Sequence, residues 1–159
     1  MDPKKTDFSP LCSRARKNIS EGRFEDALGI YADIIQIDPE FALAYGDRGT
    51  AYALLKRFDL AVANLEKSIE LGLENASIYS SLATVYSELK NYDKALENFD
   101  RAIELSPEYP FSYHNRASLL IETGDKKRAL SDLRRCLDLD PNDSAREAIL
   151  KKIEECEQA

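Results

Sequence analysis

The sequence has few of the residues on which metal sites, disulfide frameworks and catalytic triads depend. It contains one histidine, His114, and three cysteines, Cys12, Cys136 and Cys156, among 159 residues. An odd number of cysteines without a CxxC pair is typical of thiols in a reducing compartment, not of disulfides or a zinc site. A single imidazole also disfavours histidine-based catalysis. We therefore predict no metal and no cofactor.

Long apolar runs are missing as well. No stretch approaches the roughly 18 apolar residues of a membrane span, and the first seven residues lack the apolar segment of a signal peptide. The motifs GxxxxGK[ST], HExxH, GxSxG and GxGxxG, which mark nucleotide binding, zinc proteases and serine hydrolases, are absent too. We expect a cytoplasmic protein that is not an enzyme and does not insert into a membrane.

Basic residues are outnumbered, with 22 Lys and Arg against 29 Asp and Glu and a net charge of −7. This balance disfavours general binding of nucleic acid or anionic membranes, because neutralising phosphates requires clustered Lys and Arg. The strongest basic cluster, residues 126–128 with Arg134 and Arg135, is interleaved with acids and is interpreted as a solvated face. A hydrophobic content of 43% is nevertheless high enough for a folded core.

What the chain does contain is an internal repeat. One series of alanines and one series of mainly aromatic residues recur at the same constant spacing: Ala27, Ala61, Ala95 and Ala129; Leu11, Tyr45, Tyr79 and Tyr113. Such a period indicates stacked supersecondary units. It predicts a tail over 1–7 and four repeats, over 8–41, 42–75, 76–109 and 110–143.

Each repeat is predicted to form two amphipathic helices, because its apolar residues recur at helical spacing on both sides of a polar break. The second helix is expected to end at Pro39, Pro107 or Pro141, or at Gly72 in the second repeat. Residues 144–159 begin with a capping box, Ser144 to Glu147, and continue with one apolar stripe. They predict a C-terminal capping helix that closes the array, so we expect the chain to be complete.

The third repeat carries the whole pattern of a known family. Its residues at the family's positions are Tyr79, Leu82, Ala83, Tyr86, Ala95, Phe99, Ala102 and Pro107. The chain therefore resembles a tetratricopeptide repeat (TPR) protein. The resemblance implies an all-α fold, a right-handed α-solenoid of helix-turn-helix TPR units. Arg14, Arg48 and Arg116 replace the leucine of the first helix. We expect their stems to cover the core and their guanidinium groups to meet carboxylates.

The resemblance also implies that the first helices line a concave groove that binds a protein or peptide partner. The candidate groove residues are Arg16, Asp47, Thr50, Ser80, Ser81, Thr84, Phe111, His114, Asn115 and Ser118. Hydroxyl groups dominate, which favours hydrogen bonding to a peptide over ion pairing. Phe111 is interpreted either as an exposed anchor or as a residue that packs beside Tyr113. Asn115 is either a ligand contact or simply the common residue at its position.

Some TPR adaptors hold the acidic carboxyl terminus of heat-shock proteins in a clamp of Lys, Asn and Arg. The matching positions hold Cys12, Arg16, Asp47, Ser77 and Ser81 when counted from the first repeat, and Gly46, Thr50, Ser81, Phe111 and Asn115 when counted from the second. Neither set supplies the charged donors that two carboxylates require. We predict a module without this clamp. The alternative is a self-assembling structural protein that stacks through its terminal helices or its groove.

Overall fold

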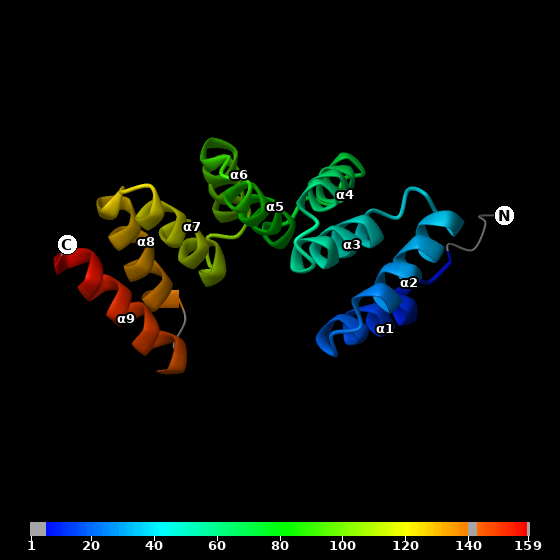
Figure 1. The fold of residues 1–159 in the computed structure, drawn as a ribbon, viewed down its shortest axis with the longest axis horizontal. Coiled ribbons are helices and arrows are strands. Elements are labelled where there is room, and N and C mark those ends of the chain that lie inside the picture. The colour runs from blue at the N-terminus through cyan, green and yellow to red at the C-terminus, as the bar shows by residue number, and fades with distance from the viewer. Residues whose placement is uncertain (1–5, 140–142, 159) are drawn as a thin grey trace. The chain divides into compact units, whose positions relative to one another are not determined.

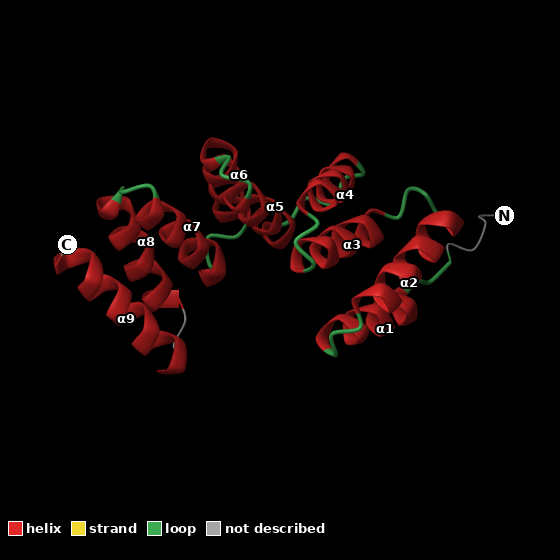
Figure 2. Ribbon diagram, in the orientation of Figure 1, coloured by secondary structure: helices red, strands yellow, loops and turns green. Residues whose placement is uncertain are grey.

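The computed structural model describes residues 6–139 and 143–158, except for the side chains of residues 143–145. Over these ranges the ordered elements are α-helices joined by short turns, and no strand is drawn among them (Figures 1 and 2). The predicted all-α fold is confirmed. Pro141 and the side chains of Ser144 and Ala145 lie outside the described residues.

The helices alternate between a first and a second helix of each predicted repeat. The first helices are α1 (Ser9–Ser20), α3 (Ala42–Leu54), α5 (Ala76–Glu88) and α7 (Pro110–Glu122). The second helices are α2 (Phe24–Ile37), α4 (Phe58–Glu70), α6 (Tyr92–Leu105) and α8 (Lys126–Leu139), and α9 (Asp143–Gln158) follows them. The second helices begin one repeat period apart, at the spacing found in the sequence.

The turn between the two helices of a repeat contains one residue in the left-handed region. The four residues are Gly22 (φ 76°), Lys56 (φ 57°), Lys90 (φ 61°) and Gly124 (φ 87°), which again follow the repeat period. In each case the next amide bonds to a carbonyl five residues earlier, such as Arg23 N to Asn18 O at 2.8 Å. This bond is typical of a Schellman motif, which ends the first helix and reverses the chain.

The chain divides into two compact parts, the N-terminal half (Met1–Glu74) and the C-terminal half (Asn75–Ala159). In the N-terminal half, α1 packs against α2 and α3 against α4. Gly49 allows α3 and α4 to approach closely, because a Cβ atom at that position would lie 2.8 Å from Leu65 Cγ. The core between α1 and α2 includes Phe8, whose ring lies 5.1 Å from that of Phe41.

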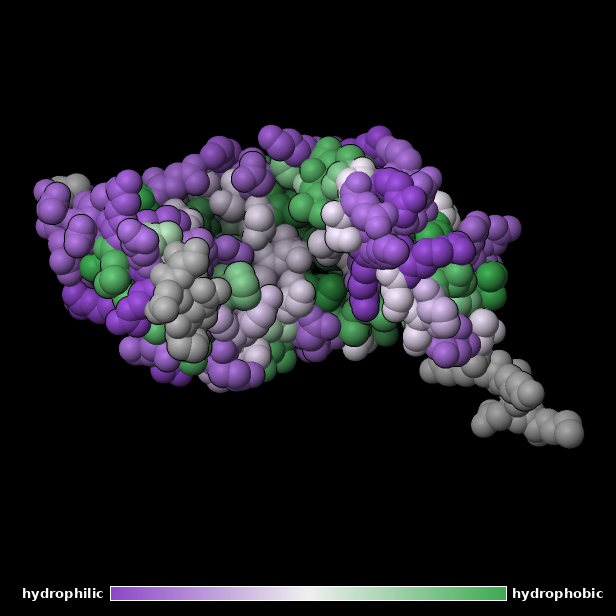
Figure 3. All heavy atoms as spheres, turned by 90° about the horizontal axis from the view of Figure 1, so that it is seen from below, coloured by the Kyte–Doolittle hydropathy of each residue, from purple (hydrophilic) through white to green (hydrophobic). Residues whose placement is uncertain are grey.

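In the C-terminal half, α5 packs against α6, α7 against α8, and α9 against α8. Ile149 and Ile153 of α9 join the apolar cluster of α7 and α8 that includes Leu133. The helix therefore covers apolar surface that α7 and α8 would otherwise expose to water. On the face shown in Figure 3, hydrophilic residues are widespread and hydrophobic residues form smaller patches.

The arginines that replace the family leucine meet three different environments. Arg116 forms ion pairs with Asp132 of α8 (2.7 Å) and Asp100 of α6 (2.5 Å), as we expected. Arg48 instead donates to an amide oxygen, that of Asn64, at 2.7 Å. Arg14 differs again because the matching place in α2 holds Ile30 instead of a polar residue. Its side chain lines a surface hollow that is described below.

Candidate functional site

One face of α7 carries four of the predicted groove residues. His114 and Asn115 lie three and four residues after Phe111, and Ser118 lies four and three residues after them, which places the four on one side of a helix. Phe111 is 58% exposed, and its ring contacts Tyr109 at a centroid distance of 5.4 Å. The structure thus presents an aromatic side chain to solvent beside polar groups.

A lysine from α9 reaches this face of α7. The Nζ atom of Lys152 lies 3.2 Å from His114 Nε2 and 3.1 Å from Ser118 Oγ. Burial and the charge of Lys152 lower the pKa of His114, and a hydrogen bond with the Asn115 side chain only partly opposes them. The ring is therefore neutral near pH 7, with Nε2 accepting from the ammonium group.

The lowered pKa of His114 predicts a pH-dependent stability of the C-terminal half. The unfolded chain binds the proton more readily, so the stabilisation is complete above the usual pKa of 6.5 and is lost as pH falls through the lower pKa of the folded state. We expect urea unfolding midpoints to fall from pH 7.5 to pH 5.5 more steeply for the wild type than for His114→Gln. If the urea midpoint of both proteins falls equally with pH, His114 is not the source of the pH dependence.

Hydroxyl groups at the ninth position of the second, third and fourth repeats share one hydrogen-bonding pattern. Thr50, Thr84 and Ser118 donate to the carbonyl four residues earlier, at 3.1, 2.9 and 3.1 Å. Because a hydroxyl has one proton, each oxygen is left only with acceptor capacity. These side chains can therefore receive N–H donors from a partner but cannot donate to it.

Two adjacent serines of α5, Ser80 and Ser81, lie in different environments. Ser80 is 7% exposed, and its hydroxyl shares a hydrogen bond of 2.8 Å with Ser112 of α7. This places its side chain in the packing between α5 and α7, where a partner cannot reach it. Ser81 is half-buried and Thr84 exposed on the same helix. Ser80 is therefore left out of the surface that we propose below.

In the N-terminal half, Arg16 and Asp47 bind each other. Arg16 Nε lies 2.9 Å from Asp47 Oδ2, and the buried Tyr31 hydroxyl donates to the same carboxylate oxygen at 3.3 Å. The hydrogen bond with Asp47 raises the pKa of Arg16. Burial, followed by the charge of Asp47, raises the pKa of the neighbouring Cys12 thiol, which therefore stays protonated near pH 7.

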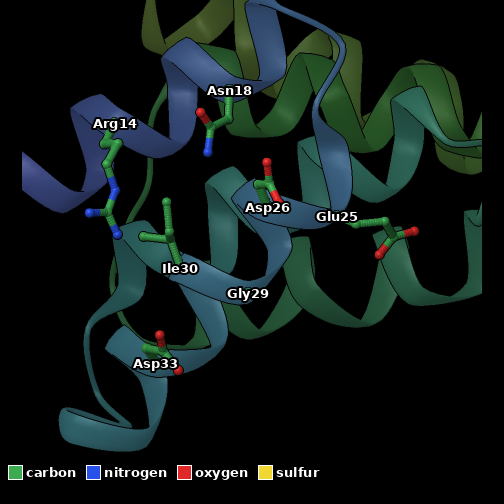
Figure 4. Close-up of a pocket in the computed structure, with 7 residues that line it drawn as sticks. All are labelled: Arg14, Asn18, Glu25, Asp26, Gly29, Ile30 and Asp33. Carbon is green, nitrogen blue, oxygen red and sulfur yellow. The ribbon is translucent and has the colours of Figure 1, made fainter.

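A hollow of about 450 Å³ lies between α1 and α2. Figure 4 shows Arg14 and Asn18 reaching from α1 toward Ile30 and Asp26 of α2. Gly29 lies in the wall, with no atom within 4 Å of the position of a Cβ atom. In the fourth repeat, Arg116 stands at the position of Arg14 and forms an ion pair with Asp100 of the preceding second helix, α6.

Sequence reasoning missed Lys152 as a residue of this site. The predicted fourth repeat ends at residue 143, but Lys152 stands one full period after Ser118. The series Arg16, Thr50, Thr84 and Ser118 therefore continues into α9, and extending the period by one step would have found the lysine. The predicted capping helix α9 thus continues the register of the first helices.

The described residues were also compared with what a metal site and a membrane span require. Across residues 6–139 and 143–158, no three His, Cys, Asp or Glu side chains are grouped closely enough to hold a metal ion. Within the same ranges, no helix has both the length and the apolar character needed to cross a bilayer.

The family pattern of the tetratricopeptide repeat matches residues 40–108 and 74–142. Together these matches span more than half of the sequence. The chain belongs to the tetratricopeptide repeat family.

Three individual proteins are similar to this chain. The Hsp70-Hsp90 organizing protein of Triticum aestivum is 39% identical over 51 residues, which are 32% of this chain and 9% of that protein. The structure of YrrB, described as a TPR protein with an unusual peptide-binding site, is 28% identical with a TM-score of 0.71, covering 87% of this chain and 71% of that one. The first TPR of Spaghetti (RPAP3), bound to the HSP90 peptide SRMEEVD, is 22% identical with a TM-score of 0.67, covering 74% and 90%.

Proposed function

We propose that this chain is a non-catalytic interaction module of four TPR repeats, over 8–41, 42–75, 76–109 and 110–143, which binds a protein or peptide. The surface proposed for the C-terminal half consists of Ser81, Thr84, Phe111, Asn115 and Ser118. The observation that carries the proposal is the exposure of Phe111, at 58%, on the face of α7 that also carries polar groups. An exposed aromatic ring beside hydrogen-bonding side chains is typical of a binding hot spot.

The relatives support the same class of function. YrrB, which is 28% identical to this chain, is described as having a peptide-binding site. The exposed, acceptor-only hydroxyl of Thr84 suits a backbone N–H group of an extended peptide. The proposed partner is therefore recognised by shape and hydrogen bonds rather than by bulk charge.

Substitution of Phe111 tests the proposal. We expect Phe111→Ala to weaken capture of the partner that the wild type retains from its native cell extract by about 2 kcal/mol or more, because an exposed anchor loses its contact area. Calorimetry with the purified partner, on the wild type and on Phe111→Ala, measures this loss of binding free energy. Leu105→Ala is the matched control, because Leu105 is an exposed apolar residue on a second helix of the same half. Equal affinities of Phe111→Ala and wild type would refute the proposed surface.

We further propose that the module lacks the clamp for acidic heat-shock tails. Arg16, the cation at the matching positions of the first repeat, is already paired with Asp47 at 2.9 Å. We expect no micromolar binding of the peptide SRMEEVD in fluorescence anisotropy, with the RPAP3 domain as the positive control. Micromolar affinity for this chain would overturn the proposal.

Self-association is a second candidate, favoured by the hollow between α1 and α2. Arg14 and Ile30 line this hollow, whereas in the fourth repeat the arginine at the position of Arg14 is paired with Asp100 of the preceding second helix. A helix of another copy docking there would form a head-to-tail contact. Light scattering over a range of concentrations separates the two functions, because the binding module predicts a monomer throughout.

A further inference from the structure

We propose that Lys152 forms a binding site for one carboxylate group of the peptide partner. The site comprises the ammonium group of Lys152, with Phe111 and Asn115 on the adjoining face of α7. This inference rests on the proposed function, for which it names one recognised chemical group. It differs from the heat-shock clamp because it uses a single cation, which α9 supplies.

The environment of the ammonium group supports this site. Lys152 donates to two neutral acceptors, His114 Nε2 at 3.2 Å and Ser118 Oγ at 3.1 Å. Among the residues that the structure describes, it forms no ion pair with a carboxylate. An ammonium group has three N–H donors, so one remains for a ligand. A charged donor and a carboxylate form one of the stronger hydrogen bonds in proteins.

Other cations of the C-terminal half have different partners from Lys152. Several of these cations already pair with a carboxylate of the chain: Lys90 with Glu122, Arg116 with Asp132, Arg134 with Glu157, and Lys151 with Glu155. Lys152, by contrast, is half-buried and donates to two neutral acceptors, in a chain with a net charge of −7. Its charge remains available to an incoming anion.

The ammonium group of Lys152 is also held in place. Ser118 Oγ, which accepts from Lys152, itself donates to the carbonyl of His114 at 3.1 Å. The half-buried His114 ring contacts the same ammonium group through Nε2 at 3.2 Å, so α7 holds it at two points. A donor that is already positioned loses little conformational entropy when a ligand binds. The exposed ring of Phe111 on the same face would contact the apolar part of the residue that carries the carboxylate.

The test begins with acetate, which is the carboxylate group alone. We expect saturable shifts of the His114 ring signals and the Lys152 amide signal in NMR spectra of the full chain at pH 7.5, beyond those caused by chloride at equal ionic strength. Lys152→Gln should weaken acetate binding about tenfold or more, because it removes a charge-assisted hydrogen bond. Shifts equal to those with chloride, or unchanged binding by Lys152→Gln, would overturn the inference.

The matched control is Lys151→Gln, which removes the same charge from the adjacent position. Lys151 is 77% exposed, and its Nζ atom lies 3.9 Å from Glu155. We expect this variant to bind acetate like the wild type. An equal loss in both variants would mean that only net charge matters, and would refute a site at Lys152. Circular dichroism before each titration verifies that both variants are folded.

Three forms of one peptide then identify the source of the carboxylate. Acetyl-Ser-Gly-Leu-Ser-Gly-Leu is used with a free carboxyl end, with an amide end, and with an amide end and Glu in place of the second Ser. Tighter binding of the first form assigns a chain terminus, and tighter binding of the third assigns an acidic side chain. If the neutral form binds equally well, the carboxylate inference fails while the proposed function stands. If acetate binds and no peptide does, the peptide interpretation itself is wrong.

Discussion

Replacing Arg116 with leucine should destabilise the C-terminal half by about 3–5 kcal/mol, because it leaves a buried carboxylate without its partner. The Asp132 side chain is 7% exposed, and Arg116 Nε and Nη2 both donate to it at 2.7 Å. Burial opposes the charge of Arg116, but the hydrogen bonds with Asp132 and Asp100 outweigh it and raise the pKa of Arg116. Urea unfolding followed by circular dichroism measures the loss.

A second substitution should restore most of this stability. The third repeat holds Leu82 and Asn98 at the positions of Arg116 and Asp132, so Arg116→Leu with Asp132→Asn copies an arrangement that the chain already uses. Replacing both members of a buried ion pair with fitting neutral residues is often close to neutral. If the double variant is as unstable as Arg116→Leu alone, the unpaired carboxylate is not the cause.

Arg134→Leu is the control for the loss of an arginine as such. Arg134 is 64% exposed and pairs with Glu157 at 3.0 Å. Exposed ion pairs contribute about 0–1 kcal/mol, so this variant should unfold close to the wild-type midpoint. The contrast with Arg116 separates the effect of burial from that of charge.

The repeat and its helices could be predicted from the sequence because they depend on local periodicity. Residues 22, 56, 90 and 124 occupy the same turn, yet two of them are glycine and two are lysine. The position within the repeat therefore determines the left-handed backbone conformation of this turn, whether the residue is glycine or lysine. The same reasoning correctly placed Gly72, at φ 90°, after α4.

The burial and the hydrogen-bond partners of individual side chains could not be predicted from the period. Ser80 and Ser81 are adjacent hydroxyl residues, but only the position of α7 decides that Ser80 is buried against Ser112. From the sequence, Arg16 was expected to offer its charge to a partner. In the structure its guanidinium group instead donates to the Asp47 carboxylate, 31 residues further along the chain. Such pairings depend on how neighbouring helices pack, which a periodic pattern leaves open.

Gly49→Ala should destabilise the N-terminal half by about 1–3 kcal/mol, the usual range for an overpacked core. The added Cβ atom would lie 2.8 Å from Leu65 Cγ and 3.0 Å from the Leu65 backbone nitrogen. Rotation of the Leu65 side chain relieves only the first contact, so α3 and α4 must also separate. The first, third and fourth repeats carry a buried alanine at this position: Ala15, Ala83 and Ala117. The close approach is thus specific to the second repeat.

Gly29→Ala makes the same change in the same half and should have the opposite sign. Gly29 lies within α2 and is exposed, and a Cβ atom there meets nothing within 4 Å. Alanine restricts the unfolded chain and favours the helix, which should add about 0.5–1 kcal/mol. Urea unfolding of the two variants side by side measures both effects. If both variants lose stability, helix propensity is not the controlling factor at Gly29. If both gain stability, α3 and α4 accommodate the methyl group, and the close approach at Gly49 does not limit their packing.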